Sequence, residues 1–232
     1  MSSASSHSPP ELPAELPPGL RAKILGSTAA VPAPTQSEWQ RRSVVVTGVG
    51  VAVSLAMFAA IGGVQLGRRP AIYVAVLGAA WAALLLVASP WALGRGRSSV
   101  GRPSKALGAL SLALPVLIVG AMGAAALAWP ETLSIDDDRS DIRCFVVALA
   151  LGAGPYAAFL WVKRRLVLVH PHVEAAAAGV FAGTLGALLI TLRCDCSELG
   201  HLVLGHVLPV VALGVGSALV AGRWFARAPL SA

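Results

Sequence analysis

Long apolar runs separated by short polar segments dominate the chain from residue 43 onward. Six such runs occur, at residues 43–66, 71–93, 106–128, 142–162, 173–192 and 200–221. Each has about 20 residues or more, the length that an α-helix needs to cross a hydrocarbon core of about 30 Å. The pattern predicts an all-α polytopic membrane protein with six transmembrane helices.

The fifth and sixth runs carry the most detail. Gly179, Gly183 and Gly186 recur three or four residues apart along the fifth run, and small residues at this spacing let another helix approach the backbone closely in lipid. A polar turn at residues 193–198 separates this run from the sixth. We therefore expect the two runs to form a helical hairpin whose first helix lies inside the bundle.

The composition agrees with a membrane protein. Hydrophobic residues make up 56% of the chain and charged residues 12%, whereas soluble domains carry about 25% charged residues. The alternating pattern of a transmembrane β-barrel is absent from the sequence. The composition therefore excludes a soluble domain and leaves a helical bundle.

The first 42 residues differ from the rest in being rich in Ser, Pro and Ala. Such a segment cannot bury enough apolar surface to fold alone, so we expect a mostly disordered tail. The exception is a short amphipathic helix that we expect at residues 17–26. Leu20, Ile24 and Leu25 form its apolar side, and the cations Arg21 and Lys23 flank that side. A helix of fewer than about 12 residues is marginal in water, so this one needs a partner. The alternative is a loose basic tail that only orients the first crossing.

The distribution of Lys and Arg predicts the orientation. Thirteen of the 18 basic residues lie in the tail, in the polar segments after the second and fourth runs, and at the C-terminus. The positive-inside rule then places both termini in the cytoplasm. This divides the chain into a cytoplasmic tail (1–42), a six-helix membrane domain (43–222) and a cytoplasmic C-terminal tail (223–232). Because the cations flank apolar runs, without interleaved aromatic residues, we expect no direct nucleic-acid binding.

All three cysteines, Cys144, Cys194 and Cys196, fall on the outer side in this topology. Thiols in a periplasm tend to oxidise, which predicts a disulfide between Cys144 and either Cys194 or Cys196. The alternative is that the cysteines remain thiols at a helix end.

A metal or haem site is a third interpretation of the same region. Cys194, Cys196, His201 and His206 form a C-x-C-x₄-H-x₄-H series of metal-ligand types. Five residues advance a regular helix by about 500°, which would point the two histidines about 140° apart. We therefore predict no resident metal and no cofactor, and expect His206 to be a neutral hydrogen-bonding partner between helices.

Enzyme and transporter signatures are missing from the sequence. It shows no nucleophile beside a base, no phosphate-binding loop and no paired carboxylates, and single hydroxyls such as Ser217 are expected to bond back to the preceding turn. The middles of the six runs carry no charge, whereas transporters commonly place ionisable residues there. These absences predict a protein that is not an enzyme.

Several distinctive sequence features occur between residues 142 and 222. They are Cys144, the run LALGAGPYAAFL, His170-Pro171, the glycine-spaced fifth run, Cys194 and the sequence Gly-His-Val-Leu-Pro at 205–209. This set resembles the NrsF-type negative regulators of sigma factors, which are six-helix inner-membrane anti-sigma proteins of bacteria. In layout the resemblance extends over residues 12–226.

The resemblance implies a function and a location. It implies that the cytoplasmic N-terminal segment binds an extracytoplasmic-function sigma factor at the bacterial inner membrane. The candidate contacts come from the amphipathic pattern at 17–26 and are Leu20, Arg21, Lys23, Ile24 and Leu25. It also implies that the outer cysteines take part in sensing or stability, with Cys144 and Cys194 matching the family's pair and Cys196 an extra. Two alternatives stay open: a small transporter or permease, and a membrane redox or metal sensor without a sigma partner.

Overall fold

A computed structural model describes most of the apolar part of the chain. The described residues are 36–65, 70–93, 140–163, 171–196 and 198–225, with Ile118, Gly120, Ala121, Gly123, Ala124, Leu127 and Ala128. The chain divides into two units, residues 1–35 with 229–232 and residues 36–228, and every described residue lies in the second. The expected short helix at 17–26 lies outside the described residues.

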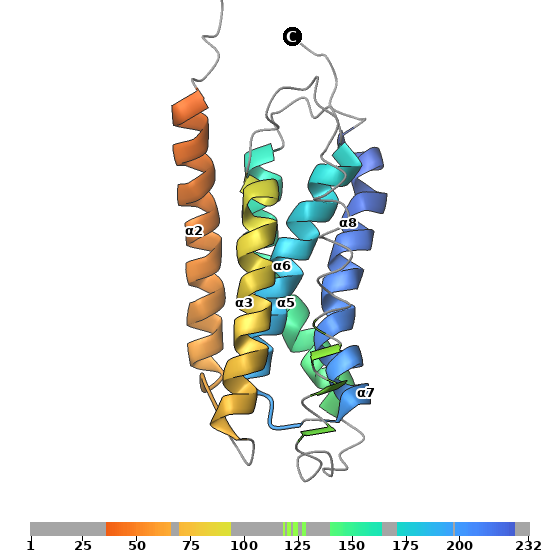
Figure 1. The fold of residues 1–232 in the computed structure, drawn as a ribbon. Helices are drawn as coiled ribbons and strands as arrows, with labels where there is room; N and C mark the ends of the chain where they lie inside the picture. Colours follow the sequence, from red (N-terminus) through yellow and green to blue (C-terminus); the bar gives the residue numbers. More distant parts are fainter. Residues whose placement is uncertain are drawn as a thin grey trace, which may run out of the picture. The chain divides into compact units, whose positions relative to one another are not determined.

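The described residues form helices and no strands, which confirms the all-α prediction. The elements are α2 (Gln36–Ala60), α3 (Ala71–Leu93), α5 (Ser140–Lys163), α6 (Pro171–Arg193), α7 (Leu199–Leu202), the π-helical turn η2 (Val203–Val207) and α8 (Leu208–Phe225) (Figure 1). Five stretches are long and apolar enough to cross a membrane: α2, α3, α5, α6 and the run through α7, η2 and α8. Most of the expected run at 106–128 lies outside the described residues, and its described members are helical.

Helix α6 begins and ends as its sequence indicates. Pro171 stands at its first position, where the missing N–H costs nothing. Glu174 lies in its first turn and Arg193 in its last, so both charges interact favourably with the helix dipole. The sequence of α6 therefore specifies both of its boundaries.

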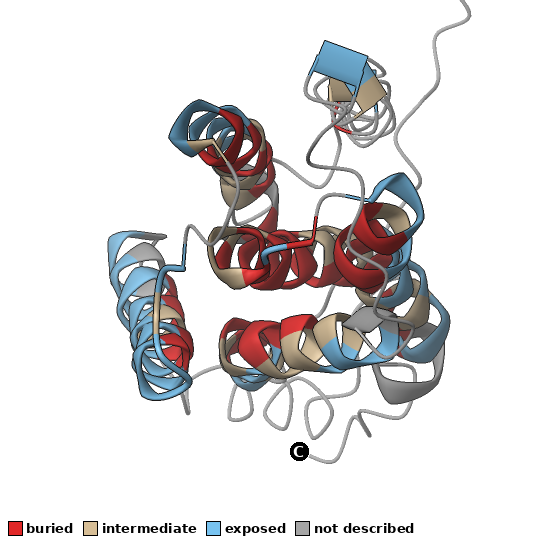
Figure 2. Cartoon of the chain, turned by 90° about the horizontal axis from the view of Figure 1, so that it is seen from below, coloured by how far each residue is buried: buried red, intermediate tan, exposed pale blue. Residues whose placement is uncertain are grey.

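Helix α6 is the central element of the bundle. Of its membrane-length stretch 72% is buried, against 28% to 39% for the other four, and Figure 2 shows it enclosed by its neighbours. Gly179 and Gly183 face α8, where a Cβ on Gly183 would lie 2.6 Å from the Cα of Val210. Gly186 faces α5 at the carbonyl of Ala148. The expected close packing of the fifth run and its hairpin with the last helix are confirmed.

The apolar side chains divide between a core and an outer surface. Tyr73, Leu77 and Trp81 of α3 are buried in one cluster with Leu202 and Val210. Other large apolar side chains point outward; Leu86 of α3, Ile142 of α5 and Leu219 of α8 are 73%, 77% and 71% exposed. An outer surface of this kind suits contact with lipid chains better than contact with water.

Contacts between helix ends define two ends of the bundle. At the cysteine end, the N–H of Gln65 after α2 donates to the carbonyl of Leu192 at 3.0 Å, close to Cys194. The lysine end is defined by Lys163, whose Nζ lies 2.6 Å from Oε2 of Glu174. It also includes Arg42, 4.9 Å above the ring of Trp161.

The first and last described helices share the lysine end. Arg42 places the start of α2 there, and His172 Nδ1, 2.7 Å from the carbonyl of Ala218, places the C-terminal part of α8 there. Helix α3 runs antiparallel to α6, with Gly78 beside Leu192, so α3 ends away from the cysteine end at which α5 begins. The chain therefore returns from the lysine end to the cysteine end between α3 and α5.

Candidate functional site at the cysteine end

Four metal-ligand side chains from different elements converge at the cysteine end. They are Cys144 of α5, Cys194 directly after α6, His201 of α7 and His206 of η2, and their sulfur and nitrogen atoms lie within 4.8 Å of one another. Cys194 is 7% exposed, His201 1% and His206 0%, and Cys144 is half-buried. We call these residues the Cys2His2 cluster.

A π-helical turn brings the two histidines together. The N–H of Leu208 bonds to the carbonyl of Val203, five residues earlier, instead of the four of a regular helix. The extra residue rotates His206 toward His201, so their ring centroids lie 5.4 Å apart at an angle of 68°. The expectation that the histidines point about 140° apart is wrong, because it assumed a regular helix.

Sequence features around η2 explain the turn. Pro209 follows it closely and has no N–H, so it cannot bond to the carbonyl of Gly205, and its ring crowds that carbonyl. Gly205 lies inside the turn, where a Cβ would lie 3.1 Å from the Cβ of Cys144. The glycine therefore leaves the space that Cys144 needs to approach the histidines.

Hydrogen bonds hold the cluster together. Thr191 Oγ1 of α6 lies 2.8 Å from Nδ1 of His206, which joins α6 to η2. Cys194 Sγ lies 3.0 Å from Nε2 of His201 and 3.7 Å from Sγ of Cys144. The cluster thus connects α5, α6 and the last membrane-length stretch.

The surroundings of Cys194 favour its protonated thiol. Its hydrogen bond with Cys144 and its burial raise the pKa of Cys194, while hydrogen bonds with His201 and His206 act in the opposite direction. A bound cation would reverse this balance, because a coordinating thiol loses its proton outright.

Cys196 takes a different position from the other two cysteines. Its side chain is buried, but its thiol is outside the Cys2His2 cluster, and its backbone carbonyl lies 3.9 Å from Sγ of Cys194. Of the two partners considered for Cys144, Cys194 is therefore the one in contact. The sulfur atoms are 3.7 Å apart, compared with about 2.05 Å in a disulfide, so the disulfide stays a prediction.

An ion pair at the lysine end was missed from the sequence. Lys163 ends α5 and is buried, and its ammonium lies 2.6 Å from the carboxylate of Glu174 in the first turn of α6. A cation at a helix C-terminus and an anion at the next helix N-terminus are both favourable with the helix dipoles. That placement, across the short segment at 164–170, is the signal from which the pair could have been found.

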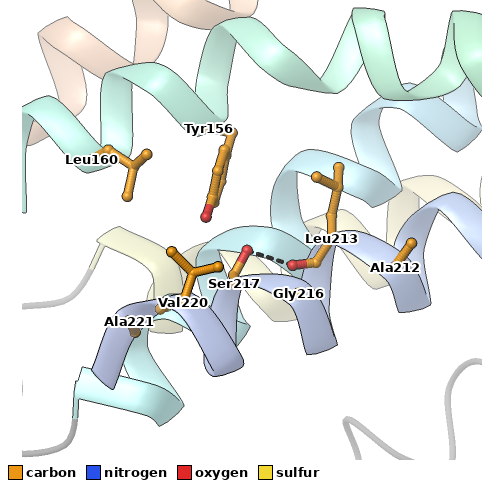
Figure 3. Close-up of a pocket in the computed structure, with 9 residues that line it drawn as sticks. Tyr156, Leu160, Ala212, Leu213, Gly216, Ser217, Val220 and Ala221 are labelled. Atoms are coloured by element: carbon orange, nitrogen blue, oxygen red, sulfur yellow. Dashed lines mark hydrogen bonds between the residues drawn. The ribbon is translucent and has the colours of Figure 1, made fainter. Parts of the chain in front are cut away.

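A cavity of about 310 Å³ lies between α5, α6 and α8 (Figure 3). Tyr156 and Ser217 are its polar lining residues, and the hydroxyl of Ser217 donates to the carbonyl of Leu213, as expected from the sequence. The lining includes no acid, base, cysteine or histidine.

Comparison with protein families decides the identity of the chain. The family model NrsF, described as negative regulator of sigma F, matches residues 27–226. The chain belongs to the NrsF family. Neither a curated protein nor a solved structure matches the chain.

NrsF membership indicates negative regulation of a sigma factor, and the family is a class of regulators, not enzymes. The match covers every described residue, including the Cys2His2 cluster. The five candidate sigma contacts lie before residue 27 and outside the described residues; they are Leu20, Arg21, Lys23, Ile24 and Leu25.

Proposed function

We propose that this protein is a multi-pass anti-sigma factor of the bacterial inner membrane. It holds an extracytoplasmic-function sigma factor at the cytoplasmic face, away from RNA polymerase, and releases it on a signal. The observation that carries this proposal is the NrsF match over residues 27–226. The partners are the sigma factor and the lipid bilayer, with no direct contact to nucleic acid.

The arrangement of the two ends of the bundle supports separate roles for them, with sigma binding at the lysine end and sensing at the cysteine end. The start of α2, which follows directly from the N-terminal tail, lies at the lysine end with Arg42. The Cys2His2 cluster lies at the other end. A six-helix topology with both termini in the cytoplasm would expose the tail to a sigma factor and the cluster to the periplasm.

The tail segment at 17–26 is the proposed sigma-binding element. Leu20, Ile24 and Leu25 form its apolar side, and each large side chain gains about 1.5 to 3 kcal/mol when fully buried. Arg21 and Lys23 flank that side, so an apolar surface with an acidic rim would match it. Such a segment is suited to folding on its partner.

The double substitution Leu20→Asp/Ile24→Asp tests this segment. We expect the variant to remain in the membrane at normal abundance while the sigma factor fails to co-purify with it and its regulon turns on. The matched control is Ser27→Asp/Thr28→Asp, which adds the same charge beside the segment and should retain sigma. Equal recovery of sigma with the wild type and the Leu20→Asp/Ile24→Asp variant would exclude the segment as the tether.

A further inference from the structure

We propose that the Cys2His2 cluster binds one d¹⁰ metal ion, with Zn²⁺ as the best match. The site consists of Cys144, Cys194, His201 and His206. Binding is a property of this cluster alone, so the proposal goes beyond sigma regulation and does not depend on it.

The donor set indicates the class of metal. Two thiolates and two imidazoles form a common set of structural zinc sites, and soft sulfur ligands select Zn²⁺ or Cu⁺ over Mg²⁺ or Ca²⁺. Two cysteines that lose their protons balance the charge of one Zn²⁺. A neutral site can be buried at the edge of a bilayer, whereas an unbalanced charge there is costly. Charge balance therefore favours Zn²⁺ over Cu⁺.

The distance between the two sulfurs fits a tetrahedral ion, and the four ligand atoms, which lie within 4.8 Å of one another, would have to draw closer by up to about 1 Å to surround it. With Zn–S of about 2.3 Å and Zn–N of about 2.0 Å, a tetrahedron places its two sulfurs about 3.8 Å apart and a sulfur and a nitrogen about 3.5 Å apart. The sulfurs of Cys144 and Cys194 are 3.7 Å apart. Cys194 Sγ and His201 Nε2 are 3.0 Å apart, so these two atoms would have to move about half an ångström farther apart to bind one ion.

The surroundings of the cluster orient its ligands. Metal-bound histidines commonly use their second ring nitrogen in a hydrogen bond that fixes the ring. Thr191 makes this bond to Nδ1 of His206, which assigns Nε2 to the metal. The π-helical turn aligns the two histidines, and such turns are frequent at functional sites. The fold therefore already orients the histidine ligands toward one another and toward the cysteines.

Coordination would tie three parts of the bundle together. Cys144 begins α5, Cys194 follows α6, and the histidines belong to the last membrane-length stretch. Four protein ligands leave no open coordination position, which is typical of a structural or regulatory site and not of a catalytic one. A disulfide between Cys144 and Cys194 would remove both sulfur ligands, so metal binding and oxidation exclude each other.

The first test is metal binding by the purified full-length protein in detergent, reduced and stripped of metal. Separate titrations use Zn²⁺, Cu⁺ and Mg²⁺. We expect one equivalent of Zn²⁺ or Cu⁺ per chain, no binding of Mg²⁺, and two sulfur and two nitrogen neighbours around Zn²⁺ by X-ray absorption. Less than a tenth of an equivalent of both Zn²⁺ and Cu⁺, or a shell of oxygen ligands, would overturn the proposal.

Single substitutions then test the ligands. We expect Cys144→Ser, Cys194→Ser, His201→Gln and His206→Gln each to weaken binding by at least about tenfold. Cys196→Ser is the matched control, because this neighbouring thiol lies outside the cluster, and it should bind as the wild type does. Far-UV circular dichroism and gel filtration identify variants that fail to fold. Wild-type affinity in both folded histidine variants would contradict the four-ligand site.

Thiol labelling in native membranes separates metal from disulfide. A bound metal protects Cys144 and Cys194 until a chelator is added, whereas a disulfide protects them until a reductant is added. Protection that only the reductant removes would contradict a resident metal. Because none of these measurements involves sigma, failure of the metal site and failure of sigma binding give different results.

Discussion

Thr191 is the side chain that fixes the orientation of His206. Its hydroxyl lies 2.8 Å from Nδ1 of that ring, and both residues are fully buried. We expect Thr191→Val to weaken Zn²⁺ binding by about 10- to 100-fold, the effect typical of losing an outer-shell partner. Isothermal titration of the purified protein measures the change.

Thr184 provides the control for Thr191→Val. It is equally buried on α6, and its hydroxyl has no hydrogen-bond partner among the described residues. Thr184→Val should therefore leave Zn²⁺ affinity unchanged. Equal losses of affinity in the two variants would show that the effect comes from packing and not from the ring of His206.

At the residue scale, the sequence predicts which residue types gather but not how their side chains meet. Charge and run lengths placed Cys144 and Cys194 at one end of the bundle, and the structure brings them into contact. The pairing of His201 with His206 could not be predicted, because it depends on one extra residue in a helical turn. Gly205 and Pro209 are consistent with the π-helical turn, but they do not by themselves predict it.

Helix α2 rests mainly on α5, and two glycines set the distance between them. A Cβ on Gly50 would lie 2.8 Å from the carbonyl of Gly154 and from the Cα of Pro155, whereas a Cβ on Gly48 would meet nothing within 4 Å. Gly50→Ala should destabilise the protein by about 1 to 3 kcal/mol through overpacking. Gly48→Ala, with the same gain in helix propensity, should not destabilise it. Thermal unfolding in detergent compares them, and equal midpoints would contradict the packing of α2 on α5.

The ion pair of Lys163 and Glu174 gives an asymmetric prediction for the α5–α6 connection. Glu174→Gln removes the carboxylate that lies 2.6 Å from the buried ammonium of Lys163, at a cost of about 3 kcal/mol. Lys163→Met leaves a carboxylate that is 21% exposed and can regain water, so it should cost less. The double substitution should be more stable than Glu174→Gln alone. Unfolding midpoints of the three variants check this order, and a double variant less stable than either single would contradict it.

At the element scale, composition predicts helices better than it predicts their neighbours. The glycines of α6 indicated the close approach of another helix, which the structure confirms. Small residues do not specify which helix will approach, so the contacts of Gly186 with α5 and of Gly183 with α8 required the structure. The ion pair of Lys163 and Glu174 was not predicted, because the basic residues near the ends of the runs were used only to predict the orientation.

The topology of the whole molecule is a separate prediction. Thirteen of the 18 basic residues lie on the side assigned to the cytoplasm, and the start of α2 shares the lysine end with the C-terminal part of α8. Reporters active only in the cytoplasm should work when fused at residues 98, 167 and 230, and periplasmic reporters at 136 and 197. Cytoplasmic activity at 136 or 197 would contradict the six-crossing arrangement.

The central claim is that the protein holds a sigma factor at the membrane. The most direct measurement compares the distribution of the sigma factor between membrane and soluble fractions in cells that contain or lack the protein. The sigma factor is first identified by purifying the tagged protein from membranes and analysing the proteins that co-purify by mass spectrometry. The account predicts that sigma sediments with the membranes only when the protein is present, and becomes soluble and active in transcription when it is absent. The absence of any sigma factor from the purified protein, or an unchanged distribution of sigma between the fractions, would contradict it.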